Sequence, residues 1–285
     1  MSKFSAVIPL LHRECKLIPN VPLLLDQSTS VRSMKSEYIG AIISKRRALS
    51  ETLSSKTKCI LIQTGDQETT QELIETTALC GSFVLNVFAR IGALVCEQGF
   101  VIKHVKSHSV TNVVELSTTT VSPVGKFEID QNTDPAAIKT LYATVNEALR
   151  KDPSLTITLR RFNNALSKTI YEDKVIDITI CLESMFNSQT EVSFRFSLYN
   201  SILAGNSLES RLALFKVLKK LYTERSNLVH GNKVLDLPWV TQNWDEIIRA
   251  TKRALLKKIE FLQDHPIANW QGHLDRLALE GAQYE

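Results

Sequence analysis

The chain has 285 residues, of which 44% are apolar and 22% are charged. This composition is typical of a globular protein, and the length is sufficient for one large domain or two ordinary ones. The formal net charge is only +4, so charge alone does not indicate a nucleic-acid partner.

Cysteine usage and hydropathy exclude several further classes. The five cysteines are scattered and form no Cys-x-x-Cys pair, which argues against a disulfide framework and against a zinc site. We find no secretory signal, and no apolar run reaches the ~18 residues that a membrane span needs. We therefore expect a cytoplasmic protein with no bound cofactor or metal ion.

Residues 1–130 mix strand and helix signals, and we predict an α+β domain there. The continuous apolar run 59–62 indicates a buried strand. Residues 100–105 and 112–118 are rich in β-branched side chains and predict two more strands. The polar, serine-rich segment 27–55 has no clear assignment.

One helix is predicted inside this first domain. Thr64 and Gln67 have the spacing of a capping box, in which two side chains satisfy the first backbone N–H groups of a helix. The apolar residues that follow extend this predicted helix to about Ala93.

Residues 131–285 predict a mostly helical domain, which begins at a polar junction with Pro135 at a helix start. Two segments, 173–186 and 191–203, fit a strand period and a helical face equally well, and their helical neighbours favour helix. Together these segments give five or six helices, enough for a bundle. Apolar residues recur at clear helical spacing in four segments: 136–150, 157–170, 208–229 and 244–262.

The ends of the longest predicted helix carry recognisable signals. Residues 206–209 predict its start, with a capping residue followed by Glu209 as an acidic residue at the third position. Gly231 is well suited to end it, because glycine readily adopts the left-handed backbone of a helix C-terminus. Residues 238–243 interrupt the pattern before the next helix.

Arg225 and His230 stand near the end of this helix, with Ser226 and Asn227 between them. On a straight helix they are about 140° apart around the axis and about 7.5 Å apart along it, so they border one groove rather than share a face. Metal-free RNA cleavage needs a base for the 2′-hydroxyl, a cation for the phosphate and an acid for the leaving oxygen. Histidine suits the proton transfers and arginine suits the phosphate. One such pair is half a site, which a two-fold dimer would complete.

The segment 221–231, LYTERSNLVHG, resembles the Arg-x4-6-His signature of the HEPN superfamily. More narrowly it resembles the Apea-like HEPN group, in which an LYxxRSxxVHG ending is typical. Two earlier stretches, 161–166 and 172–186, resemble the two preceding helices of that family, and Glu183 matches the acidic residue near the end of the second. The resemblance covers roughly residues 158–231.

This resemblance implies a dimeric helical bundle, often a metal-independent endoribonuclease in a toxin or antiviral defence system. In that function His230 transfers protons, Arg225 holds the scissile phosphate, Ser226 or Asn227 orients one of them, and Glu183 supports Arg225. The implied partners are RNA, a second copy of the chain and a regulatory protein. The N-terminal domain would sense a trigger or restrain the nuclease. Ser226 departs from the family, because catalytic members often carry Asn, Asp or His there.

A second interpretation uses the same residues without catalysis. In an inactive relative, Arg225 and His230 would belong to a hydrogen-bond network of a dimerisation or partner-binding module, and Glu183 would be a structural buried acid. Several other side chains have a functional and a structural interpretation. Arg160 and Arg161 could follow an RNA backbone or lie on a solvated face. The three tryptophans could stack on bases or pack in the core. His104 and His108 have a metal-binding spacing, but their strand and loop context argues against a site.

Overall fold

The computed structural model divides the chain into two compact units, Met1–Val145 and Asn146–Glu285. The division falls inside helix α3 (Pro135–Lys151), which begins at the predicted proline. The structure describes these residues: 3–10, 14–16, 23–25, 27, 29–33, 58–64, 71–91, 100–105, 109–115, 126–129, 132–186, 191–231 and 233–280.

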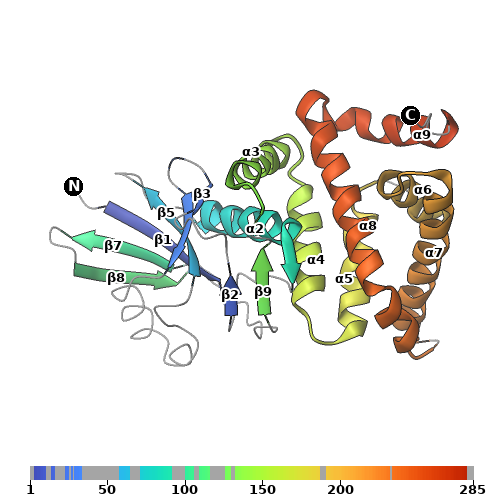
Figure 1. The fold of residues 1–285 in the computed structure, drawn as a ribbon, viewed down its shortest axis with the longest axis horizontal. Coiled ribbons are helices and arrows are strands. Elements are labelled where there is room, and N and C mark those ends of the chain that lie inside the picture. Colours follow the sequence, from blue (N-terminus) through green and yellow to red (C-terminus); the bar gives the residue numbers. More distant parts are fainter. Residues whose placement is uncertain are drawn as a thin grey trace. The chain divides into compact units, whose positions relative to one another are not determined.

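The described part of the first unit contains two sheets and one helix (Figure 1). An antiparallel sheet has the order β3-β4-β5-β1-β7-β8, and a smaller sheet has the order β2-β9-β6. The elements are β1 Lys3–Leu10, β2 Glu14–Lys16, β3 Leu23–Leu24, β4 Thr29–Ser33, β5 Lys58–Thr64, α2 Gln71–Val87, β6 Ala89–Ile91, β7 Phe100–Val105, β8 Ser109–Glu115 and β9 Lys126–Ile129. The three predicted strands are therefore confirmed as β5, β7 and β8, whereas β4 lies in the segment without an assignment.

The predicted helix of the first unit is wrong at both ends. Thr64 is the last residue of β5 and pairs with Phe4 of β1, so its backbone belongs to a sheet and does not cap a helix. Gln67 lies outside the described residues. Helix α2 ends at Val87, because the chain then enters β6, which pairs with β9. The long-range strand pairing outweighs the local capping pattern.

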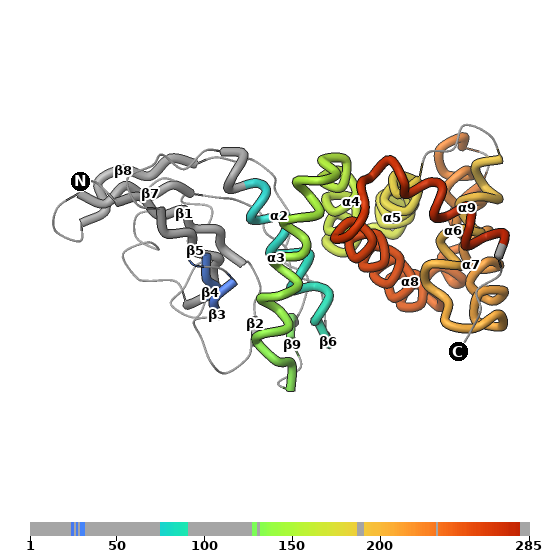
Figure 2. Tube along the Cα trace, turned by 90° about the horizontal axis from the view of Figure 1, so that it is seen from above, coloured from blue at the N-terminus to red at the C-terminus, as the bar shows by residue number. Residues whose placement is uncertain are grey.

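The described part of the second unit continues after α3 with six α-helices and a short 3-10 helix (Figures 1 and 2). These are α4 Leu155–Ser167, α5 Tyr171–Glu183, α6 Val192–Ala204, α7 Leu208–His230, α8 Leu237–Asp264, η2 Ile267–Asn269 and α9 Trp270–Glu280. The predicted helical character is confirmed, including the two ambiguous segments, which form α5 and α6. In α5 the buried residues Val175, Ile178 and Leu182 recur at helical spacing.

Two helix starts differ from the prediction. Helix α7 begins one residue later than predicted: Ser207 is the capping residue, and Ser210 completes the capping box in place of Glu209. Helix α8 runs through the predicted interruption, because Pro238 lies in its first turn, where no backbone N–H is needed.

Helix α8 organises the second unit, because it packs against α5, α6 and α7 (Figures 1 and 2). Its buried face is almost entirely apolar and includes Val240, Ile247 and Leu255. Burial of this face supplies most of the driving force for packing the bundle. None of the described helices combines the length and apolarity needed to cross a membrane.

A charged pair interrupts the apolar face of α8. The Lys258 ammonium lies 2.9 Å from the Asp152 carboxylate, and both side chains are almost completely buried. Burial by itself would raise the pKa of Asp152, but hydrogen bonds from Ser154 and the Lys258 charge outweigh it and hold the pKa below its ordinary value. The stability that this shift contributes is complete above the unfolded-state pKa near 3.8 and is lost as the pH falls through the lower folded-state pKa.

We expect Lys258→Met to lower the free energy of unfolding by about 3–5 kcal/mol, because it leaves the Asp152 carboxylate buried without its countercharge. Urea unfolding at neutral pH measures this loss. The double variant Asp152→Asn/Lys258→Met should be less destabilised than Lys258→Met alone, since no unpaired charge remains. A single variant as stable as the unchanged protein would contradict this role of the pair.

Candidate functional site

Glu183 and Arg225 face one another across two packed helices. Glu183 is the last residue of α5, and Arg225 lies in the final two turns of α7. Arg225 Nη2 lies 3.8 Å from Glu183 Oε2, with about a quarter of each side chain exposed (24% and 23%). The structure therefore brings together two of the residues that the sequence singled out, in a position that a small polar ligand can reach.

The Arg225 guanidinium keeps unused hydrogen-bonding capacity. Its Nε is buried and has no hydrogen-bond partner among the described residues. Buried donors are normally paired, so an unpaired one marks either a strained group or the place of a ligand. The other predicted arginine contact is different: Arg161 lies 2.6 Å from the buried Asp177 and joins α4 to α5, while Arg160 is exposed.

Tyr222 is a third member of this cluster, which the sequence analysis did not identify. It precedes Arg225 by three residues and so shares a face of α7 with it. The Arg225 guanidinium carbon lies 6.0 Å from the centre of the Tyr222 ring, which packs 5.2 Å from the ring of Phe196 on α6. Burial raises the pKa of Tyr222, and the charge of Glu183 and a hydrogen bond to it raise the pKa further. The phenol thus stays protonated and donates to the carboxylate.

His230 is the last residue of α7, and its side chain is exposed. Gly231 ends the helix as predicted, with φ 66° and ψ 21°, and its N–H bonds to the carbonyls of Asn227 and Leu228. Ser226 and Asn227 are partly exposed. Among the described residues, the His230 imidazole contacts neither Arg225 nor any other polar side chain. One chain therefore presents the arginine and the histidine separately.

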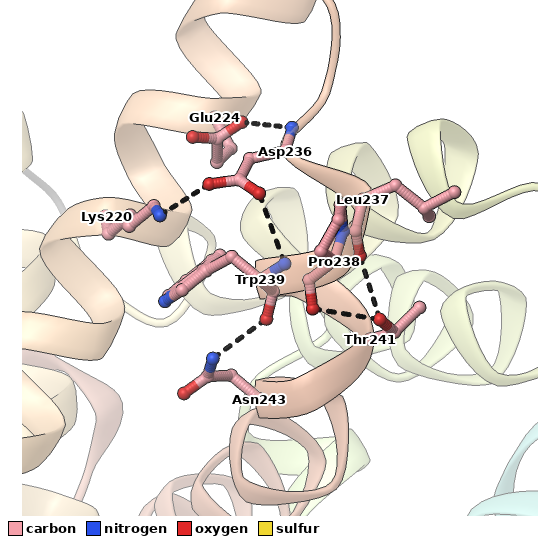
Figure 3. Close-up of polar contacts among 8 residues, drawn as sticks. All are labelled: Lys220, Glu224, Asp236, Leu237, Pro238, Trp239, Thr241 and Asn243. Carbon is pink, nitrogen blue, oxygen red and sulfur yellow. Dashed lines mark hydrogen bonds and ion pairs between the residues drawn. The ribbon is translucent and has the colours of Figure 1, made fainter.

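A polar network fixes the connection from α7 to α8 (Figure 3). The buried Glu224 carboxylate accepts a hydrogen bond from the Asp236 N–H at 3.0 Å. The Asp236 carboxylate caps α8 through the Trp239 N–H at 3.2 Å and lies 2.7 Å from Lys220. The Lys220 ammonium in turn lies 4.5 Å from the centre of the Trp239 ring. These contacts return the chain beside α7 and so hold the helix end that carries His230.

The packing interpretation is confirmed for two tryptophans. Trp244 is buried with its ring 5.8 Å from that of Tyr171 in an edge-on contact. Trp270 is buried, and its indole N–H donates to the Met185 carbonyl at 2.6 Å. Trp239 is partly exposed and belongs to the network around Lys220.

Thiol and metal chemistry gain no support from the described residues. Cys181 is buried and unpaired, and burial raises the pKa of its thiol far above its ordinary value, so the thiol is inert. His104 lies in β7, as predicted, whereas His108 lies outside the described residues. The expectation that the chain binds no metal ion stays a prediction.

No family model matches the chain, and neither does any curated protein or any solved structure. The HEPN resemblance thus depends on three stretches of sequence and on their places in the fold. Residues 161–166 lie within α4, residues 172–186 include nearly all of α5, and residues 221–231 form the end of α7.

We expect Glu224→Leu to lower the free energy of unfolding by about 1.5–3 kcal/mol, the value of a hydrogen bond to a charged group. The Asp236 N–H loses its acceptor in this variant. Glu224→Gln is the matched control, because it keeps a side-chain oxygen at the same distance and should lose much less. Urea unfolding of both variants measures the difference, and equal losses would show that the hydrogen bond contributes nothing.

Proposed function

We propose that residues 131–285 form a HEPN-type domain that cleaves RNA without a metal ion. In this proposal the protein acts as a homodimer and serves in a toxin or antiviral defence system. Residues 1–130 would sense a trigger or restrain the nuclease, by analogy with multidomain members of the family.

One observation carries the proposal. Helix α7 anchors Arg225 against Glu183 of α5 and then ends at once, so that His230 stands exposed at its last position. A phosphate needs a cation that is held in place, and proton transfer needs an imidazole that the substrate can reach. Both requirements are met within two turns of one helix.

The chemistry assigns one task to each group. His230 removes the proton from a 2′-hydroxyl, whose oxygen attacks the adjacent phosphorus, while Arg225 stabilises the negative charge on the phosphate oxygens. The bond from phosphorus to the 5′-oxygen then breaks, and that oxygen takes a proton. The products are a 2′,3′-cyclic phosphate and a 5′-hydroxyl. Ser226 or Asn227 would orient the imidazole or the guanidinium.

The same imidazole cannot be base and acid in one step, which supports a second copy of the chain. The surface around the end of α7 suits an interface. Val229 is 51% exposed, Val234 is 90% exposed and Leu237 is 47% exposed, and these residues immediately flank the His230–Gly231 turn and the start of α8. Exposed apolar side chains that gather in one place mark interaction surfaces.

A non-catalytic dimerisation or partner-binding module is the alternative. The pairing of Arg225 with Glu183 favours it, because this contact also joins α5 to α7 and is explained by packing alone. In that case the apolar residues near His230 would bind a second copy or another protein, and no RNA would be cleaved.

We expect the purified protein to cleave total RNA and transfer RNA in the presence of EDTA. Arg225→Ala and His230→Ala should each slow cleavage by about 100-fold or more, because they remove charge stabilisation and proton transfer. Gel analysis of the products over time measures the rates.

Arg249→Ala and His265→Ala are the matched controls, because they remove an exposed arginine and an exposed histidine from α8 and its C-terminal end. Both should cleave like the unchanged protein. A folded dimer that cleaves no RNA would favour the non-catalytic module. Cleavage that depends on a divalent ion would overturn the proposal.

A further inference from the structure

The contact between Arg225 and Glu183 is loose compared with other ion pairs in the same unit. Arg161–Asp177, Lys220–Asp236 and Lys258–Asp152 join their charged atoms at 2.6, 2.7 and 2.9 Å. The Arg225–Glu183 distance is 3.8 Å, which is longer than a hydrogen bond between these groups. Something other than Arg225 therefore determines where the Glu183 carboxylate lies.

Tyr222 occupies the place from which it can do this. It lies on α7 one turn before Arg225, and its ring is held against Phe196 of α6. Its hydroxyl bonds to the Glu183 carboxylate. The guanidinium carbon of Arg225 lies 6.0 Å from the centre of the Tyr222 ring, at the outer limit of a cation–π contact. The phenol and the guanidinium thus share one carboxylate.

We propose that Tyr222 is a positioning residue that keeps Arg225 available to a phosphate of the RNA, because its hydroxyl restrains the Glu183 carboxylate from closing a tight pair with the guanidinium. This inference rests on the proposed nuclease function and deepens it. The unpaired Nε of Arg225 accords with it, since a guanidinium in a closed two-point pair would have fewer donors to offer.

The consequence of losing the hydroxyl follows from the geometry of the two groups. A carboxylate released from Tyr222 has room to turn toward Arg225 and form two parallel hydrogen bonds with it, the arrangement that these groups prefer. A phosphate would then have to displace the carboxylate before it could bind. Tyr222→Phe should therefore weaken substrate binding although the phenylalanine touches no substrate.

The test is the affinity for an oligoribonucleotide with 2′-O-methyl groups throughout, which the enzyme cannot cleave. We expect Tyr222→Phe to weaken binding about tenfold, as for the loss of one charge-assisted hydrogen bond. In a Glu183→Gln background the competing charge is absent, so the same change should alter binding by less than about twofold. Tyr199→Phe is the matched control. Its hydroxyl also bonds a carboxylate, Asp275 at 2.6 Å, and its removal should leave binding unchanged.

The outcomes separate this inference from the proposed function. Unchanged binding in Tyr222→Phe, or an equal loss in the Glu183→Gln background, overturns the role of Tyr222 even if the protein cleaves RNA. The expected pattern of affinities in a protein that cleaves no RNA supports Tyr222 and overturns the nuclease. A protein that binds no RNA overturns both. Thermal unfolding of each variant shows whether a loss of binding reflects a loss of folding.

Discussion

Gly231 adopts a left-handed backbone immediately after His230, and this single conformation determines how the second unit presents its polar residues. A side chain with a β-carbon would be strained there. The helix therefore stops at His230, and the chain returns through Asp236 into α8 (Figure 3). Because α8 packs on α5, α6 and α7, the place of this turn also sets the register of the bundle.

Charged groups in the second unit have two distinct functions. Lys258 with Asp152 and Arg161 with Asp177 form tight pairs that join segments of the bundle and leave little capacity for a ligand. Arg225 differs, because its carboxylate partner is shared with Tyr222 and its Nε remains unpaired. A guanidinium that is anchored but not saturated is the feature that distinguishes a binding group from a structural one. The site is inferred from this difference rather than from the mere presence of an arginine.

The sequence sufficed for features that depend on local chemistry and failed where distant contacts decide. The end of α7 could be predicted, since glycine acts through its own backbone. The capping pattern at Thr64 misled, because pairing with Phe4, remote in sequence, places that residue in a strand. Pro238 was interpreted as an interruption, although a capped first turn accommodates it. Tyr222 escaped notice because its partner lies on another helix, although its spacing from Arg225 was visible.

The chemistry of the product ends tests the central claim most directly. A defined oligoribonucleotide is incubated with the protein in EDTA, beside the same strand with a single 2′-deoxy nucleotide at the cleaved position. The proposed mechanism predicts 2′,3′-cyclic phosphate and 5′-hydroxyl ends, and complete protection by the deoxy nucleotide, because His230 needs a 2′-hydroxyl to deprotonate. Products with 5′-phosphate ends, or cleavage at the deoxy position, would show that water is the nucleophile and would contradict the assigned roles of Arg225 and His230.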